Sequence, residues 1–413
     1  MTPEQLARIV IAFAIVAILA ALGAHPSVRR WERRLGLSVL AATGFPLLIL
    51  GYAFHQFGIV SPQLLADLRP AYEFGLGWIG FSVGMHLNIR RLDELPPSFT
   101  AIVALMSVPP ILMAGLACGL FLFAMGVLPG SGLIANVLTL AACAAVSAPA
   151  NLRLLLRHRP PEATRIVTAV TQIDQVAAFA ILALVASIFR PGRTVGLWQL
   201  PRSGWFLVTA GVGFMLGVIV YLLLRNVRSR AEEMSLLLGG IALAAGTAGY
   251  LALSVPVVCA LAGAVLANVP YRERSRLETT LEDLEHPLYL VFLFLVGTVW
   301  QPLEWEGWIL AILFAASRGY GKLLGARAAV RAAPDLLPSS RHLALALLPE
   351  SAIAIVVIFT LATLQGRPLD AVQWGIHAVI VGSILTEMFV QAQQRRESRA
   401  AGEETGPVVT EFV

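Results

Sequence analysis

The feature that most constrains this chain is a succession of apolar segments along nearly its whole length. Each segment is roughly 20 residues long, the length that an α-helix needs to cross a hydrocarbon core of about 30 Å. Hydrophobic residues make up 57% of the 413 residues and charged residues only 13%, a balance untypical of soluble domains. We therefore predict an all-helical polytopic membrane protein with thirteen transmembrane helices, at 5–24, 37–54, 71–89, 98–126, 132–152, 165–189, 204–224, 233–253, 255–269, 285–300, 307–326, 343–365 and 371–391.

Basic residues are distributed unequally between the two sets of loops. The loops that follow odd-numbered segments hold 22 of the 30 Lys and Arg residues, and the opposite set holds six. The positive-inside rule then places the N-terminus outside and the C-terminus in the cytoplasm. The net charge of +5 reflects this topology, in which basic loops are attracted to anionic lipids. It does not indicate nucleic-acid binding.

Three charged residues lie near the middle of predicted membrane segments: Asp174, Lys322 and Glu350. Each is nine residues from an arginine at the predicted cytoplasmic end of its segment, so the three share one layer of the membrane. At 1.5 Å per residue that layer is about 13–14 Å deep, where a charge costs about 2.5–3.5 kcal/mol. Lys322 is the only lysine of the chain, and Arg318 lies one helical turn before it. All four are functional candidates.

Two segments are interrupted by proline at the same depth. Segment 132–152 contains the sequence SAPAN at 147–151, and segment 343–365 has Pro349 beside Glu350. Proline frees backbone carbonyls, and interrupted transporter helices direct such carbonyls at a substrate ion. The two segments are seven apart in order. Because seven is odd, equivalent helices would run in opposite directions, which predicts inverted-topology repeats.

Several stretches of the chain together resemble one transporter family. They are EFGLGWIGFSVGMHLNIRRL, AVSAPANLRLLL, QIDQVAAFAILAL, AGYLALSVPVVCALAGAVLANV, YLVFLFLVGTVW, GYGKLLGA and SILTE. In their order and spacing, the chain resembles the monovalent cation:proton antiporters, which include NapA-type Na⁺/H⁺ and Kef-type K⁺/H⁺ antiporters. The resemblance covers nearly everything from the second to the thirteenth segment. It implies a NhaA/NapA-like transport domain, taken as residues 1–391, with a scaffold, a mobile core that moves like an elevator, and a homodimer.

The resemblance also implies candidate site residues. Relatives carry Asp-Asp, Asn-Asp or Gln-Asp in the sixth helix, and the second acid binds the cation and takes up protons. Here Asp174 falls on the first position, Gln175 on the second, and Lys322 on the lysine that pairs with a first-position acid. Ser147 and Asn151 fall near the polar residues of the interrupted fifth helix. Since a glutamine cannot exchange a proton, Gln175 is the departure from the family pattern that matters.

Three interpretations of that departure stay open. In the first, Asp174 is the exchanging acid, because a cation and a proton need only compete for one carboxylate. In the second, Glu350 takes over the missing charge. In the third, coupling is lost and the protein is a facilitator, a channel-like protein or a sensor.

Each charge also has a purely structural interpretation. Asp174 and Lys322 could form a buried ion pair that only braces the core. Glu350 could stabilise the N-terminus of the half-helix that follows Pro349. Arg318 could satisfy Glu350 or a free carbonyl as a supporting charge.

The resulting hypothesis is a secondary antiporter of the bacterial inner membrane that exchanges Na⁺ or K⁺ for H⁺. It would be neither an enzyme nor a cofactor-binding protein, and Asp174 would bind the transported cation. The alternatives are a non-coupled membrane protein on the same scaffold and an organic-anion carrier in which Arg318 and Lys322 bind a carboxylate. The expected partners are membrane lipids, monovalent cations, protons and a second copy of the chain, without nucleic acid. The tail 392–413 is predicted to be disordered and cytoplasmic.

Overall fold

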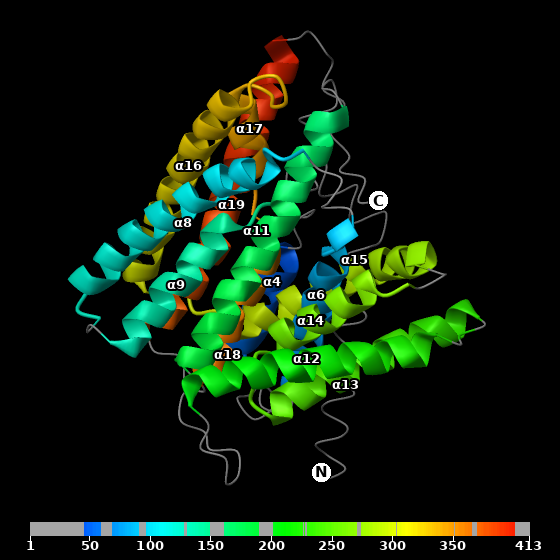
Figure 1. The fold of residues 1–413 in the computed structure, drawn as a ribbon. Coiled ribbons are helices and arrows are strands. Elements are labelled where there is room, and N and C mark those ends of the chain that lie inside the picture. The colour runs from blue at the N-terminus through cyan, green and yellow to red at the C-terminus, as the bar shows by residue number, and fades with distance from the viewer. Residues whose placement is uncertain are drawn as a thin grey trace.

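The chain folds into a bundle of α-helices, and no strand occurs in the part that the structure describes (Figure 1). The computed structural model describes residues 45–58, 68–90, 96–127, 130–148, 161–189, 201–225, 227, 229–270, 274–302, 304–350, 352–365 and 370–400. The predicted first segment, 5–24, lies outside these residues.

The helices follow the predicted segments closely. Their bounds are α4 (Phe45–Gln56), α6 (Arg69–His86), α8 (Phe99–Ala124), α9 (Ser131–Ala145), α11 (Pro161–Ile188), α12 (Arg202–Leu224), α13 (Arg230–Tyr250), α14 (Val255–Asn268), α15 (Arg274–Val299), α16 (Trp305–Ala332), α17 (Ser340–Leu347), α18 (Ala352–Gln365) and α19 (Asp370–Ala400). Five of the helices in the described part are long and apolar enough to cross a membrane. The predicted all-helical fold class is confirmed.

Three helices extend beyond their predicted ends by six residues or more. α15 begins at Arg274, α16 continues to Ala332, and α19 continues to Ala400. The first part of the tail predicted to be disordered is therefore helical, and residues 401–413 lie outside the description. These extensions are rich in Arg, Glu, Gln and Ala, which favour helix without being apolar. Hydropathy therefore marks only the part of each helix that suits a membrane.

The helices pack as two groups. One group contains α4, α6, α12, α13, α14 and α15, and the other contains α8, α9, α11, α16, α17, α18 and α19. In Figure 1 the first group lies largely at the lower right, and α8, α16, α17 and α19 lie at the upper left. Aromatic contacts join the two groups. The ring centroid of Phe359 in α18 lies 5.7 Å from that of Tyr72 in α6 and 5.9 Å from that of Phe292 in α15.

Two helix pairs in the first group pack backbone against backbone at glycines. A Cβ on Gly84 of α6 would lie 1.9 Å from the carbonyl oxygen of Ala260 in α14, and one on Gly51 of α4 would lie 2.1 Å from that of Phe294 in α15. Only glycine permits this approach. An offset of seven predicted segments maps α4 onto α14 and α6 onto α15, so it converts one pair into the other, in agreement with inverted repeats.

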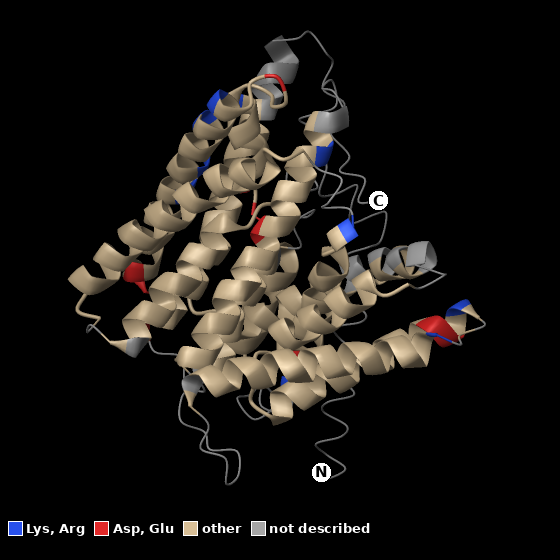
Figure 2. Cartoon of the chain, viewed as in Figure 1, with Lys and Arg blue, Asp and Glu red and all other residues tan. Residues whose placement is uncertain are grey.

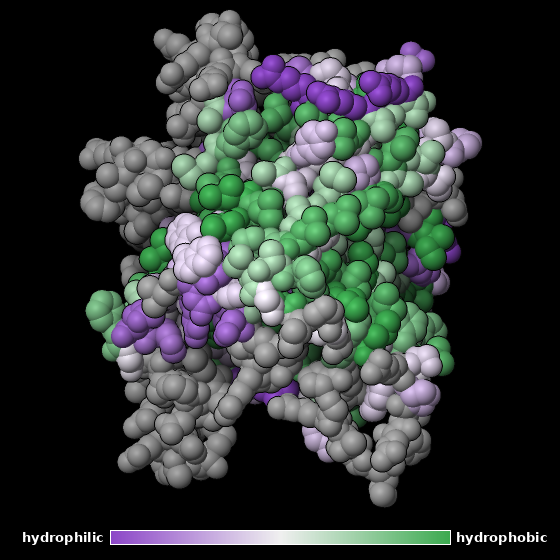
Figure 3. Space-filling model, turned by 90° about the vertical axis from the view of Figure 1, so that its left-hand side faces the viewer, coloured by the Kyte–Doolittle hydropathy of each residue, from purple (hydrophilic) through white to green (hydrophobic). Residues whose placement is uncertain are grey.

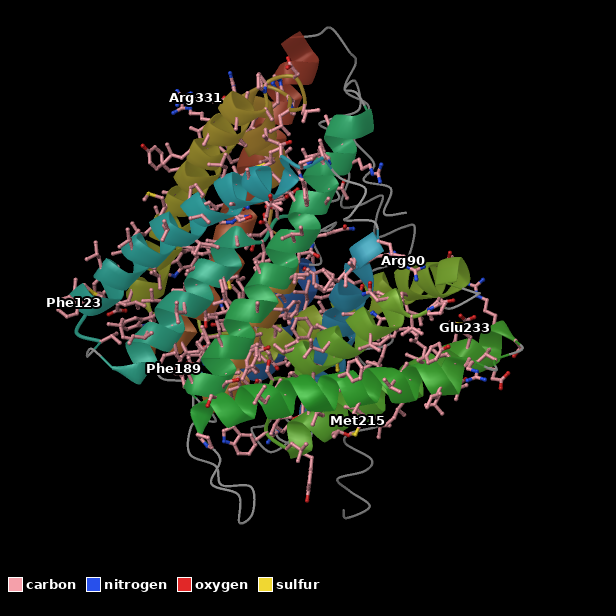
Figure 4. All side chains as sticks on the ribbon, in the orientation of Figure 1. Arg90, Phe123, Phe189, Met215, Glu233 and Arg331 are labelled. Atoms are coloured by element: carbon pink, nitrogen blue, oxygen red, sulfur yellow. The ribbon has the colours of Figure 1, made fainter. Side chains whose placement is uncertain are left out.

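The outer face of the second group is apolar. Leu112, Leu116 and Leu120 of α8 are four residues apart and 54%, 60% and 68% exposed. Figure 3 shows a broad hydrophobic region across this side of the molecule, and Figure 2 shows Lys and Arg mainly toward the helix ends. Arg331 and Phe123 lie at opposite ends of the α8–α16 pair in Figure 4. Such a face suits contact with lipid.

Candidate ion site at the crossing of two interrupted helices

Two helices stop inside the bundle and cross there. α9 ends at Ala145 and α17 ends at Leu347, and α18 resumes the second path at Ala352. The non-helical residues between them bond to each other, since the Ala148 N–H donates to the Pro349 carbonyl at 2.9 Å. The Ser147 hydroxyl donates to the Leu347 carbonyl, also at 2.9 Å. The two interruptions predicted from proline are therefore one crossing in space.

The crossing exposes the carbonyl ends of two helices to a buried interior. The last carbonyls of a helix lack helical donors, and the helix dipole makes this end partly negative. In water such carbonyls bond to solvent, but inside a membrane protein they need cationic or other donor side chains. Two basic residues of α16, Arg318 and Lys322, supply those donors.

Lys322 joins the crossing to Asp174. Its Nζ lies 3.2 Å from Oδ2 of Asp174 in α11 and 2.5 Å from the carbonyl oxygen of Ala145. Both side chains are buried, at 1% and 0% exposure. The hydroxyl of Ser107 in α8 donates to the other carboxylate oxygen, Oδ1. Asp174 thus has a different donor on each oxygen.

Arg318 forms a second buried ion pair one turn earlier on α16. Its Nε lies 3.3 Å from Oε1 of Glu350, and neither side chain is exposed. This contact lacks hydrogen-bond geometry, so it is an ion contact only. The guanidinium instead donates to the carbonyls of Val146, at 2.6 Å, and Leu348, while Ser383 of α19 donates to Oε2 of Glu350. Arg318 therefore bridges both interrupted helices.

Close packing of α8 against α16 brings these groups within reach. A Cβ on Gly321 would lie 2.5 Å from Cα of Pro110 in α8, so the two helix backbones touch beside Lys322. α8 contains Pro109 and Pro110 within its length. Ser107 precedes them in the same turn, and its hydroxyl reaches Asp174 of α11, which also packs against α8.

The structure brings together most of the residues predicted from sequence. Asp174, Lys322, Arg318, Glu350 and Ser147 all lie at the crossing, and Ser147 bonds to the backbone there. Their roles in binding stay predictions.

Two further predicted residues are Gln175 and Asn151. Gln175 is buried next to Asp174, at 4% exposure, and its side-chain amide makes no hydrogen bond within the described part of the chain. Asn151 lies outside the described residues.

Sequence reasoning missed two hydroxyls of the site, Ser107 and Ser383. Serine is common in membrane helices, where its hydroxyl can bond to its own helix, so neither residue stands out by type. Ser107 lies two residues before a Pro-Pro pair, and Ser383 opens the stretch SILTE. The nearby prolines could have drawn attention to Ser107, and the family motif could have drawn attention to Ser383.

These features define a class of protein: a helical membrane transporter in which two interrupted helices cross beside paired buried charges. The family model described as sodium/hydrogen exchanger, transmembrane, matches residues 14–392, and the chain belongs to this family. It is therefore a multi-pass membrane antiporter for cations and protons and not an enzyme. The family predicted from the resemblance is confirmed.

Solved structures agree on the fold. The sodium proton antiporter MjNhaP1 from Methanocaldococcus jannaschii at pH 8 superposes with a TM-score of 0.64 at 15% identity, covering 95% of this chain and 97% of that chain. An electron-microscopy structure of the same antiporter gives 0.57 at 16% identity, covering 96% and 99%. At these identities the likeness shows the fold alone. No curated relative matches the sequence significantly.

Proposed function

We propose that the protein exchanges Na⁺ for H⁺ and that Asp174 is the carboxylate for which the two ions compete. The observation that supports this most directly is the buried pair of Asp174 with Lys322, placed against the carbonyl end of α9. A lysine can lose its proton or change partners when buried. An arriving cation can therefore take its place on the carboxylate, and protonation of Asp174 can release the cation.

Glu350 is less suited to be the coupling acid. Its partner is an arginine, which stays charged in proteins, and Ser383 occupies its other oxygen. Arg318 in turn donates to three backbone carbonyls, those of Val146, Leu348 and, at 3.5 Å, Pro349. Releasing Glu350 would leave a buried arginine without its counter-charge, which is costly. These contacts favour the structural interpretation of Glu350.

The same contacts disfavour an organic-anion carrier. Arg318 and Lys322 each face an acidic side chain and at least one backbone carbonyl, so neither cation is free for a substrate carboxylate. Potassium stays the alternative cation, since carboxylate and carbonyl oxygens suit both alkali ions.

The test uses purified protein in proteoliposomes with an imposed pH gradient and a fluorescent pH dye. Collapse of the gradient on adding Na⁺, Li⁺ or K⁺, but not choline, is expected for the wild type and for a folded Glu350→Gln. Asp174→Asn is expected to lower the rate of collapse by at least about 100-fold, because an amide cannot take up a proton in place of the Asp174 carboxylate. Loss in Glu350→Gln with retention in Asp174→Asn would assign coupling to Glu350. No cation response in the wild type would exclude antiport.

We further propose the arrangement expected from the resemblance: a homodimer in a bacterial inner membrane, with a cytoplasmic C-terminus and elevator-like movement of one helix group. The two packing groups and the uneven distribution of arginine support it. A cysteine introduced at Ser398 should react with an impermeant thiol reagent only from the cytoplasmic side, and the mass in detergent should be that of two chains.

A further inference from the structure

Ser107 stands where an apolar helix reaches the charged site. The hydroxyl is buried, at 6% exposure, whereas the next residue, Val108, is 46% exposed on the outer face of α8. Within the described part of the chain, Asp174 has two side-chain partners, Ser107 on Oδ1 and Lys322 on Oδ2. Ser107 is therefore the neutral oxygen in direct contact with the exchanging carboxylate.

The ammonium of Lys322 occupies the place of a monovalent cation. It lies 2.5 Å from the Ala145 carbonyl oxygen and 3.2 Å from Oδ2 of Asp174, so both oxygens face one positive charge. When Lys322 withdraws, those two oxygens become available to an alkali ion. Two oxygens replace only part of a hydration shell, and further oxygens are needed to offset the loss of water.

The serine hydroxyl has the chemistry to be one of them. It has one proton to donate and two acceptor lone pairs. It can therefore keep its hydrogen bond to Oδ1 while a lone pair meets a cation on the same carboxylate.

Pro109 and Pro110 follow Ser107 and interrupt the backbone hydrogen bonds of α8, as the helix ends do at the crossing. They lack the N–H groups that would bond to the carbonyls of Leu105 and Met106, so two backbone oxygens beside Ser107 lose their usual helical donors. A Cβ on Gly325 would lie 2.7 Å from the Leu105 carbonyl oxygen, which shows that this part of α8 is pressed against α16. The part of α8 next to Asp174 therefore carries the Ser107 hydroxyl and two backbone carbonyls without their usual helical donors.

We propose that Ser107 is a ligand of the transported cation, completing with Asp174 and the Ala145 carbonyl an oxygen set drawn from α8, α11 and α9. The inference rests on the proposed exchange at Asp174 and adds to it a third helix and a determinant of cation selectivity. A ligand contributed by α8 also ties cation occupancy to the packing of α8 against α11 and α16, the two helices that carry Asp174 and Lys322.

The test measures exchange in proteoliposomes as a function of Li⁺, Na⁺ and K⁺ concentration. Ser107→Ala should raise the apparent KM of the transported cation about tenfold, as expected for loss of one good ligand, and should change the ratio of KM values among the three ions. Ser107→Thr keeps the hydroxyl and should stay within about threefold of wild type. Ser187→Ala is the matched control, because Ser187 is a buried serine of α11 whose hydroxyl, among the described residues, bonds only to the Ala183 carbonyl of its own helix.

The outcomes separate a ligand from a positioning residue. If Ser107 only orients Asp174, Ser107→Ala would shift the pH profile and change all three KM values equally, which would overturn the proposal. Unchanged KM values would overturn it as well, with exchange at Asp174 intact. If Ser107→Ala does not fold, Ser107→Cys, which replaces the oxygen with sulfur at similar volume, should show the same loss of affinity and selectivity. Wild-type protein without exchange would instead refute the proposed function itself.

Discussion

The two buried ion pairs of α16 have the same composition, one acid and one base, but they are built differently. Lys322 contacts one carboxylate and one carbonyl, whereas Arg318 contacts one carboxylate and the carbonyls of Val146, Leu348 and Pro349. Val146 follows α9 and Leu348 follows α17, so the arginine bonds to both interrupted helices at once.

This difference separates two tasks within a single turn of helix. A guanidinium is planar, holds five donors and keeps its charge, so it suits a permanent bridge between two helix ends. An ammonium is a point charge whose proton can leave, so it suits a contact that must be broken in each cycle. The comparison predicts that the Arg318 pair stabilises the crossing and that the Lys322 pair serves exchange.

The largest expected effect is on stability, in Arg318→Ala. Removing the guanidinium leaves Glu350 charged and buried and two carbonyls without a donor, which should cost about 3–5 kcal/mol. Thermal unfolding of the detergent-solubilised protein would measure this loss. The double variant Arg318→Ala with Glu350→Gln should recover part of it, because no unpaired charge then remains. An unaltered unfolding temperature in Arg318→Ala would contradict the bridging role.

A smaller effect, on transport, is expected for Lys322→Arg. The arginine preserves a positive charge beside Asp174 but cannot readily lose its proton, so exchange should fall about tenfold or more while stability changes little. Initial rates of gradient collapse would show it. Arg318→Lys is the matched exchange on the other pair, and it should lower stability more than rate. The opposite pattern in the two variants would assign the roles the other way round.

Next in size is Ser147→Ala. Loss of its bond to the Leu347 carbonyl removes one neutral hydrogen bond and leaves a buried acceptor, at a cost of about 1–2 kcal/mol. The unfolding midpoint should drop, while the cation KM should stay near that of wild type. A large change in KM without loss of stability would instead make Ser147 a ligand, as the resemblance predicts.

The smallest effect is expected for Gln175→Leu. The buried amide makes no side-chain hydrogen bond within the described residues, so an apolar side chain of similar volume should be neutral or slightly stabilising. Exchange rates should remain within about threefold of wild type. A strong loss of exchange would show that Gln175 binds the ion during the cycle, in the position where relatives carry an acid.

Much of the fold follows from sequence because a bilayer imposes length and hydropathy on each helix. The depth of Asp174, Lys322 and Glu350 also follows, since rise per residue converts sequence distance into position along the membrane normal. Rotation and tilt of neighbouring helices do not follow from this count. The rotation and tilt of these helices decide whether Arg318 pairs with Glu350 or with Asp174.

The partner of Ser107 could not be predicted for a related reason. The Pro-Pro pair nearby could draw attention to Ser107, but nothing in the local sequence specifies that its hydroxyl meets Asp174 of α11 or that α8 packs against α16 at Gly321. The helical start of the predicted tail was missed because hydropathy does not detect polar helix.

The hydrogen bonds at the crossing also have a consequence for biosynthesis. Ser147 and Ala148 find their partners in residues made about 200 positions later. When α9 first enters the bilayer, its carbonyl end has neither Arg318, nor Lys322, nor the second interrupted segment to meet it. We therefore expect these carbonyls to bond to water or lipid headgroups until the C-terminal half has been made. Neither half is then expected to reach its final structure without the other.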